Sequence, residues 1–235
     1  SHTHSFPFLR FTHSTLWSTA MAPDSHKLRL FFFPLMTPGH MIPVVDMAKL
    51  LAGCGVECTI VTTPANVPLL RPAIDRSNPP IGVLLLPFPS SAVGLPDGCE
   101  NLRSVPPGSL ANFLEAVGML REPFAGLLRD HLPDAVLTDV FIPWTADVAR
   151  ELGIPRLVFH GTCFFTLCAS ASVYRHAPAD DLPDGAETFV VPGLPHRVEM
   201  WTTQLPAERS LPAVADVMKG IRDSEDISYG VVVNS

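Results

Sequence analysis

The stretch LRLFFFPLMTPGHMIPVVDMAKLLAGCGVECTIVTT, from Leu28 to Thr63, decides how this chain folds. Its segment Leu30 to Phe33 is apolar at every position, which is typical of a parallel strand covered on both faces. A Pro/Gly turn and a helical pattern follow, and the run Glu57 to Thr62 is rich in β-branched residues. The stretch therefore predicts one strand–helix–strand unit, with the right-handed connection that such units almost always have.

Sequence signals mark both ends of the helix in this unit. Pro43 is expected in the first helical turn, where a missing N–H costs nothing, and Gly53 is placed as the stop. His40 lies just before the helix, in the turn Thr37-Pro38-Gly39-His40 that follows the first strand. Open α/β sheets bind their ligands at this edge, so His40 occupies a ligand-favouring place.

The rest of the chain continues the alternation of strands and helices. Further strands are expected over residues 82–86, 135–138, 156–159, 189–191 and 231–233. Helices are expected over residues 65–74, 110–131 with a kink at Pro123, 144–152, 163–176 with Thr162 as its cap, and 213–222. Residues 87–108 and 192–211 are expected to be irregular, and 178–185 to be an acidic linker. This order predicts an α/β fold with a doubly wound parallel sheet.

Composition narrows the possible classes of protein. The 235 residues carry a formal net charge of −7 without a Lys/Arg cluster, which disfavours nucleic acid and anionic membrane as partners. No apolar run reaches the ~20 residues that a membrane span needs. Five cysteines without a C-x-x-C pair suggest neither a disulfide framework nor a zinc site, so we expect reduced thiols and a cytoplasmic location.

The two ends of the chain differ from its middle. Residues 1–27 are expected to be a disordered leader, because the first twenty contain Ser, Thr, His and Arg but no acid. The leader is either an organelle transit peptide or sequence translated ahead of an initiator at Met21. At the other end, the predicted strand 231–233 is followed by only two residues, which suggests a cut at a domain boundary.

Two titratable residues follow predicted strands, namely His40 after the first and Asp139 after the fourth. If the sheet order reverses at its first strand, these two strands are neighbours and their ends meet across a crevice. The carboxylate would then bond one imidazole nitrogen and leave the other free as a base. Each residue also has a structural interpretation, because His40 can bond nearby backbone at a helix start and Asp139 can cap a helix.

Other motifs argue mainly by exclusion. G-x-G-x-x-G is absent after the first strand, as are the P-loop and the G-x-S-x-G elbow, which disfavours dinucleotide, P-loop and α/β-hydrolase chemistry. His160 and His176 are not spaced as a zinc pair and suit turn and surface positions. Trp144, Phe164 and Phe165 either line an apolar pocket or belong to the core.

Three segments together resemble one family. They are FFPLMTPGHMIPVVDMAKLLAGCGVECTIVTTPAN, then GLPDGCEN at residues 94–101, then LTDVFIPWTADVARELGIPRLVFHGTCFFTLCA. In order and spacing they are similar to the amino-terminal half of plant UDP-sugar-dependent glycosyltransferases, particularly those that glycosylate flavonoids and triterpenoids. The resemblance covers Leu28 to the end, and it implies that residues 28–235 are the Rossmann-like acceptor-binding domain of a two-domain GT-B fold.

The resemblance also implies roles for residues at matching positions. His40 would be the base that deprotonates the acceptor hydroxyl, and Asp139 its partner. Gly39 and Thr162 would approach the UDP-sugar, a co-substrate rather than a bound cofactor, and no metal would take part. The acceptor, a flavonoid, terpenoid, steroid or phenolic, would be lined by three aromatic residues, Phe141, Trp144 and Phe164. Residues 94–101 would form a rim that tunes acceptor choice.

One departure from the family pattern is large. The Trp- and His-containing stretch that grips the UDP-sugar in the family's carboxy-terminal domain is absent from these residues, so we expect this chain to lack that domain. We therefore expect sugar transfer, with inversion and with glucose as the expected sugar, for the whole protein but not for this chain alone. Two alternatives stay open: a non-catalytic module that binds small molecules, and an incomplete gene product.

Overall fold

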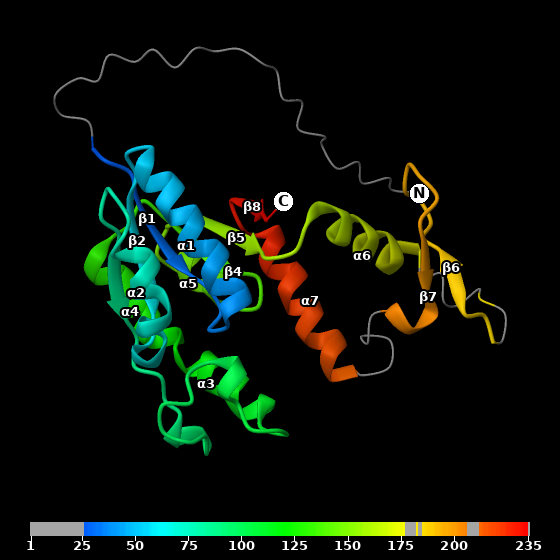
Figure 1. Cartoon of the computed structure of the whole chain (residues 1–235), viewed down its shortest axis with the longest axis horizontal. Helices are drawn as coiled ribbons and strands as arrows, with labels where there is room; N and C mark the ends of the chain where they lie inside the picture. The colour runs from blue at the N-terminus through cyan, green and yellow to red at the C-terminus, as the bar shows by residue number, and fades with distance from the viewer. Residues whose placement is uncertain (1–25, 177–181, 183–184, 206–211, 235) are drawn as a thin grey trace, which may run out of the picture.

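A six-stranded parallel sheet forms the centre of the computed structural model, which describes residues 26–176, 182, 185–205 and 212–234 (Figure 1). The strand order is β3-β2-β1-β4-β5-β8. The strands are β1 (Arg29–Phe33), β2 (Glu57–Thr62), β3 (Gly82–Leu85), β4 (Ala135–Asp139), β5 (Arg156–His160) and β8 (Gly230–Val233). Every pairing in this sheet is parallel, so the predicted fold class is confirmed.

Helices connect the strands and cover the sheet. They are α1 (Pro38–Gly53), α2 (Val67–Ile74), α3 (Leu110–Met119), α4 (Arg121–His131), α5 (Trp144–Glu151), α6 (Phe164–His176) and α7 (Pro212–Asp226). A separate antiparallel hairpin, β6 (Thr188–Val190) with β7 (Glu199–Trp201), lies with α6 to one side of the sheet (Figure 1).

Strand β1 alternates its side chains between two hydrophobic clusters. Phe31 and Phe33 pack in one cluster with α3, α4 and α5, while Leu30 and Phe32 pack in the other with α1 and α2. All four side chains are at most 5% exposed. The wholly apolar strand is therefore buried on both faces, as its sequence predicts.

The structure corrects two helix boundaries. Helix α1 begins at Pro38, so Pro43 lies inside the helix rather than in its first turn, and His40 belongs to the helix instead of the preceding turn. The expected single helix 110–131 is two helices, α3 and α4, separated at Leu120. Pro123 lies in the first turn of α4, where its missing N–H is tolerated, so it accompanies a helix start and not a kink.

The structure also corrects the predicted irregular region 192–211. Strand β7 and a 3₁₀ turn, Thr202–Gln204, lie within it, and β7 supplies the partner that β6 needs. Sequence analysis missed β7 because a three-residue strand gives too little alternation to recognise. The expected linker at 178–185 falls mostly outside the described residues.

The long loop at 87–108 is ordered and tied to the sheet. It contains two 3₁₀ turns, Ser91–Val93 and Leu102–Ser104. The buried carboxylate of Glu100 accepts a hydrogen bond from the Ala65 amide at 2.8 Å, and the Leu102 amide donates to the Met36 carbonyl at 2.8 Å. These bonds fix the loop beside the ends of β1 and β2.

Helix α6 is more exposed than its apolar sequence suggests. Ala169 and Val173 are buried, and Val173 packs with the β6–β7 hairpin, but Phe164 and Phe165 are 60% and 58% exposed. The core interpretation of these two aromatics is therefore wrong. Part of the leader is placed as well, since the His26 ring bonds Asp134 at 2.8 Å, while residues 1–25 lie outside the described part.

The central strand generates a stability prediction. Phe32 is 0% exposed, so Phe32→Ala should lower the free energy of unfolding by about 3–5 kcal/mol through lost burial and a cavity. Urea unfolding followed by circular dichroism measures the change. The control Phe165→Ala removes an exposed ring and should cost no more than ~0.5 kcal/mol. Equal losses for the two variants would contradict the burial assigned to β1.

Candidate functional site

The candidate site lies where β1 and β4 run side by side. From β1 the strands β2 and β3 follow toward one edge of the sheet. From β4 the strands β5 and β8 follow toward the opposite edge. This reversal is the topological switch point at which open α/β sheets bind ligands. His40 follows β1 in the first turn of α1, and Asp139 is the last residue of β4. The prediction that these two strands are adjacent in the sheet is confirmed.

A short hydrogen bond joins the two residues. His40 Nδ1 donates to Asp139 Oδ2 at 2.7 Å. The other carboxylate oxygen, Oδ1, accepts from the Phe141 amide at 3.0 Å, so the carboxylate also starts the turn after β4. Asp139 is 0% exposed, whereas the His40 side chain is 22% exposed. One member of the pair is therefore fixed in the interior and the other reaches the surface.

The pair changes the acidity of the histidine. The hydrogen bond that His40 donates to Asp139 raises the pKa of His40 above its usual 6.5, partial burial opposes this rise, and the negative charge of Asp139 adds to it. Within the described part of the chain, no hydrogen bond involves His40 Nε2. The bond at Nδ1 thus fixes the ring and leaves Nε2 as the nitrogen that can accept a proton.

An aromatic side chain, two glycines and a threonine lie around this pair or at the ends of the neighbouring elements. The Phe141 ring meets the His40 ring edge-on, with centroids 5.7 Å apart, and is 44% exposed. Gly161, after β5, lies so close that an added Cβ would stand 3.9 Å from His40 Nδ1. Gly39 and Thr162 are both exposed, Gly39 at the start of α1 and Thr162 just before α6.

Trp144 lies deeper than the other predicted acceptor residues. Its ring centroid is 6.2 Å from that of Phe33 and 5.8 Å from that of Phe124, and the partly buried side chain packs against the cluster that contains them. Phe141 and Phe164, in contrast, present much of their surface to solvent. The structure therefore brings His40, Asp139 and Phe141 together, and it places Trp144 partly buried against the core.

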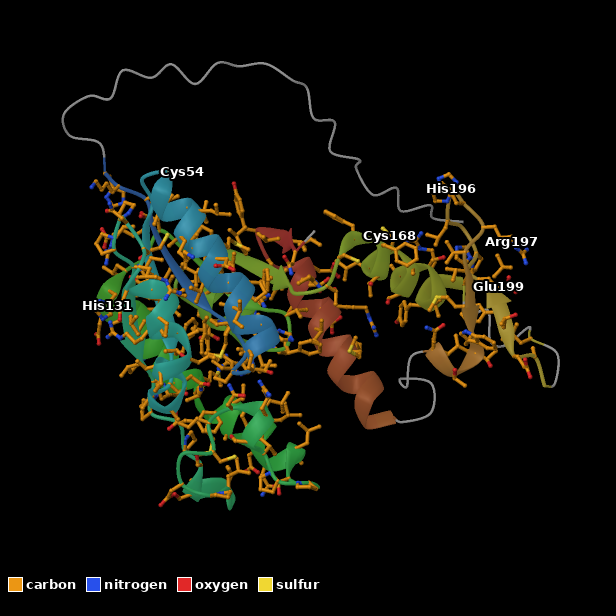
Figure 2. The ribbon with its side chains drawn as sticks, viewed as in Figure 1. Cys54, His131, Cys168, His196, Arg197 and Glu199 are labelled. Atoms are coloured by element: carbon orange, nitrogen blue, oxygen red, sulfur yellow. The ribbon has the colours of Figure 1, made fainter. Side chains whose placement is uncertain are left out.

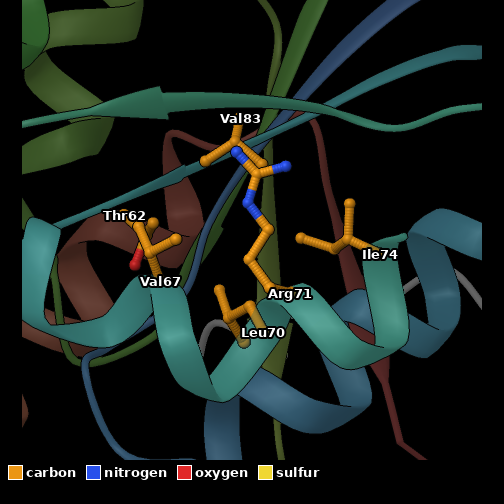
Figure 3. A pocket seen from close by; sticks show the side chains of 6 residues that line it. All are labelled: Thr62, Val67, Leu70, Arg71, Ile74 and Val83. Carbon is orange, nitrogen blue, oxygen red and sulfur yellow. The ribbon is translucent and has the colours of Figure 1, made fainter. Parts of the chain in front are cut away.

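A small hollow lies away from this site. Figure 3 shows it between α2 and β3, with the Arg71 side chain extended across it. Its empty space is about 140 Å³, well below the several hundred that ligand pockets usually have. It is lined by Thr62, Val67, Leu70, Arg71, Ile74 and Val83. The hollow is too small to serve as a substrate site.

No metal centre is evident in the described part. Its residues include no group of three or more His, Cys, Asp or Glu side chains that could hold a metal ion. All five cysteines are free, and Figure 2 shows Cys54, just after the end of α1, far from Cys168 on α6. Among the same residues, no helix is long and apolar enough to cross a membrane.

Sequence analysis missed a polar cluster behind the site. Arg156, at the start of β5, is buried and bonds to groups on β4 and α7, and His160 Nε2 bonds Glu225 Oε1 at 2.6 Å. The sequence offered one weak signal, a charged residue at the start of a strand otherwise apolar. The Arg156 partners Ser224 on α7 and Ser228 just after α7 lie 68 and 72 positions further along the chain.

Comparison with known proteins identifies close sequence and fold relatives. No family model matches the chain. A scopoletin glucosyltransferase of Nicotiana tabacum is 45% identical over 216 residues, which are 89% of this chain and 45% of the relative. UDP-glucose flavonoid 3-O-glucosyltransferase 7 of Fragaria ananassa is 42% identical over 89% of this chain and 43% of its own length.

A solved structure agrees with these sequence matches. A Glycyrrhiza uralensis UDP-glycosyltransferase, complexed with glycyrrhetinic acid 3-O-monoglucuronide, is 40% identical with a TM-score of 0.83. The match covers 89% of this chain and 44% of that one. The chain thus spans less than half the length of the relatives it matches. The expected resemblance to plant UDP-glycosyltransferases is confirmed in both sequence and fold.

The pair generates a prediction about proton binding. Asp139→Asn removes the carboxylate whose hydrogen bond and charge raise the pKa of His40, so the titration midpoint of His40 should fall. Nuclear magnetic resonance titration of the imidazole ring measures the midpoint directly. Asp147→Asn, an exposed carboxylate on α5 paired with Arg150, is the control and should leave the midpoint unchanged. A midpoint unmoved by Asp139→Asn would show that the pair does not act on His40 as described.

Proposed function

We propose that this chain, a relative of the plant UDP-glycosyltransferases, forms the acceptor-side half of an enzyme that transfers a sugar from a UDP-sugar to a hydroxyl group. The observation that carries the proposal is the His40–Asp139 hydrogen bond of 2.7 Å at the switch point, with His40 partly exposed and Asp139 fully buried. Such a pair suits a general base that must take a proton from an alcohol.

The chemistry assigns one task to each member of the pair. His40 Nε2 takes the hydroxyl proton while the acceptor oxygen forms a bond to the anomeric carbon of the sugar. The bond from that carbon to the diphosphate breaks, and UDP leaves with the electron pair, so the configuration at the carbon inverts. Asp139 keeps the ring oriented and stabilises the imidazolium that forms, as the carboxylate does in other acid–histidine pairs.

The acceptor would lie against the exposed aromatic side chains near this pair. The Phe141 ring contacts the His40 ring. Phe164 is the first residue of α6, and it follows Gly161, which lies close to His40. Such surfaces suit a flat, largely apolar molecule that carries hydroxyl groups. Flavonoids, other phenolics, terpenoids and steroids have this chemistry. Trp144, partly buried against the core, would line the deeper side of the same acceptor pocket.

Fewer residues of this chain are proposed to contact the UDP-sugar donor than the acceptor. Gly39 lies at the start of α1, where backbone N–H groups and the helix dipole favour a phosphate group. Thr162 lies at the exposed turn after β5 and could reach the sugar or the diphosphate. Most contacts to UDP would come from the other half of such an enzyme, since the match covers 45% of one relative and 43% of another. We propose a cytoplasmic location and no metal in the reaction.

The chain alone should therefore not turn over. Incubated with UDP-glucose and a panel of flavonols, it should form no more glucoside than its His40→Ala variant, measured by liquid chromatography. Calorimetry without UDP-sugar tests the acceptor surface in the same preparation. Flavonol binding without transfer fits an acceptor-side half as well as a non-catalytic module. A rate above that of His40→Ala would contradict the predicted inactivity.

Joining the chain to a carboxy-terminal half separates those two possibilities. In that full-length protein, His40→Ala should reduce kcat by about 10²- to 10⁴-fold, the usual contribution of a general base. His196→Ala, at an exposed position before β7, is the matched control and should retain the parent rate. If His40→Ala left turnover undiminished, the assignment of His40 as the base would fail.

A further inference from the structure

Arg156 carries a buried positive charge directly behind the histidine–aspartate pair. The residue is 3% exposed at the start of β5. Its Nε donates to Thr138 Oγ1 at 2.7 Å, and one terminal nitrogen donates to Ser228 Oγ at 2.7 Å and to the Ser224 carbonyl at 3.3 Å. The other terminal nitrogen donates to the backbone carbonyl of Asp139 at 3.4 Å. The guanidinium thus joins the end of β4 to the end of α7.

This guanidinium has no direct acidic partner. Among the described residues, no carboxylate lies within 4.0 Å of it, although buried charges are usually paired. Burial lowers the pKa of Arg156 to about 10, and the charges of Glu225 and Asp139 oppose that fall. Both carboxylates therefore act on Arg156 through space, and Arg156 acts equally on them.

Each of these two carboxylates holds a histidine. Asp139 on β4 bonds His40 on α1, and Glu225 on α7 bonds His160 on β5 at 2.6 Å. Within the described part of the chain, the charges that act on the guanidinium are those of Glu225 and Asp139. One buried cation is therefore shared by both pairs, and its hydrogen bonds to neutral groups hold it in place.

We propose that Arg156 is a positioning residue for His40, whose fixed positive charge opposes the tendency of the buried Asp139–His40 pair to take up a proton. Its hydrogen bonds to the Asp139 and Ser224 carbonyls also hold the end of β4 beside α7. The consequence for catalysis rests on the proposed function, because a base must be unprotonated before it can accept the acceptor's proton. The effect on proton uptake does not rest on it.

The sign of the effect follows from charge alone. Without the guanidinium, the negative charge of Asp139 loses its buried counter-charge, so adding a proton to the pair becomes more favourable. A smaller fraction of His40 would then be neutral near pH 7.

The experiment measures the His40 titration midpoint by nuclear magnetic resonance in the chain itself. Arg156→Met keeps much of the side-chain volume without the charge and should raise the midpoint by roughly half a pH unit or more. Arg156→Lys keeps the charge and should restore most of the parent midpoint, which a purely packing role would not predict. Arg150→Met removes an exposed arginine of α5 and should leave the midpoint unmoved. A folded Arg156→Met variant with the parent midpoint would overturn the proposal.

A second variant decides the question if Arg156→Met does not fold. Glu225→Gln removes the other carboxylate that balances the guanidinium, so the net charge behind the pair becomes more positive. The His40 midpoint should then fall, in the direction opposite to Arg156→Met. An unchanged midpoint in Glu225→Gln would overturn the proposal. Neither measurement depends on sugar transfer, so failure of the proposed function would leave this test intact.

Discussion

Strand β1 pairs in parallel with β2 on one side and with β4 on the other, and the candidate site depends on that double pairing. Phe32 faces Ile60 of β2 and Leu137 of β4 in the two registers. The same registers bring the end of β4 level with the end of β1, where the chain turns into α1. The 2.7 Å bond between His40 and Asp139 is therefore a consequence of sheet order, although 99 positions separate the two residues.

Much of this arrangement could be predicted from the sequence. The apolar run of β1, the β-branched run of β2 and the turn between them indicate a parallel sheet, because only a strand covered on both faces is apolar throughout. The pairing of His40 with Asp139 needed the assumed strand order, which the structure has. Pro43 lies inside α1 rather than in its first turn, and Pro123 lies in the first turn of α4 rather than at a kink, because the position of a proline alone does not say where a helix begins.

The remainder could not be predicted, for physical reasons. Exposure of Phe164 and Phe165 depends on what covers α6, and their apolar character gives no information about that. Arg156 bonds to α7 across about 70 positions of chain, and no local pattern encodes such a contact. A buried charge becomes visible only when the surfaces that enclose it are placed. The enclosed charge of Arg156 interacts with both Asp139 and Glu225, so it connects the His40–Asp139 pair with the His160–Glu225 pair.

The central claim is that Asp139 holds the proton of the neutral His40 ring on Nδ1 and leaves Nε2 to act as the base. A nitrogen–proton correlation spectrum of the imidazole, recorded at a pH where the ring is neutral, tests it most directly. The account predicts a protonated Nδ1 and a bare Nε2. A proton on Nε2, with Nδ1 bare, would contradict it.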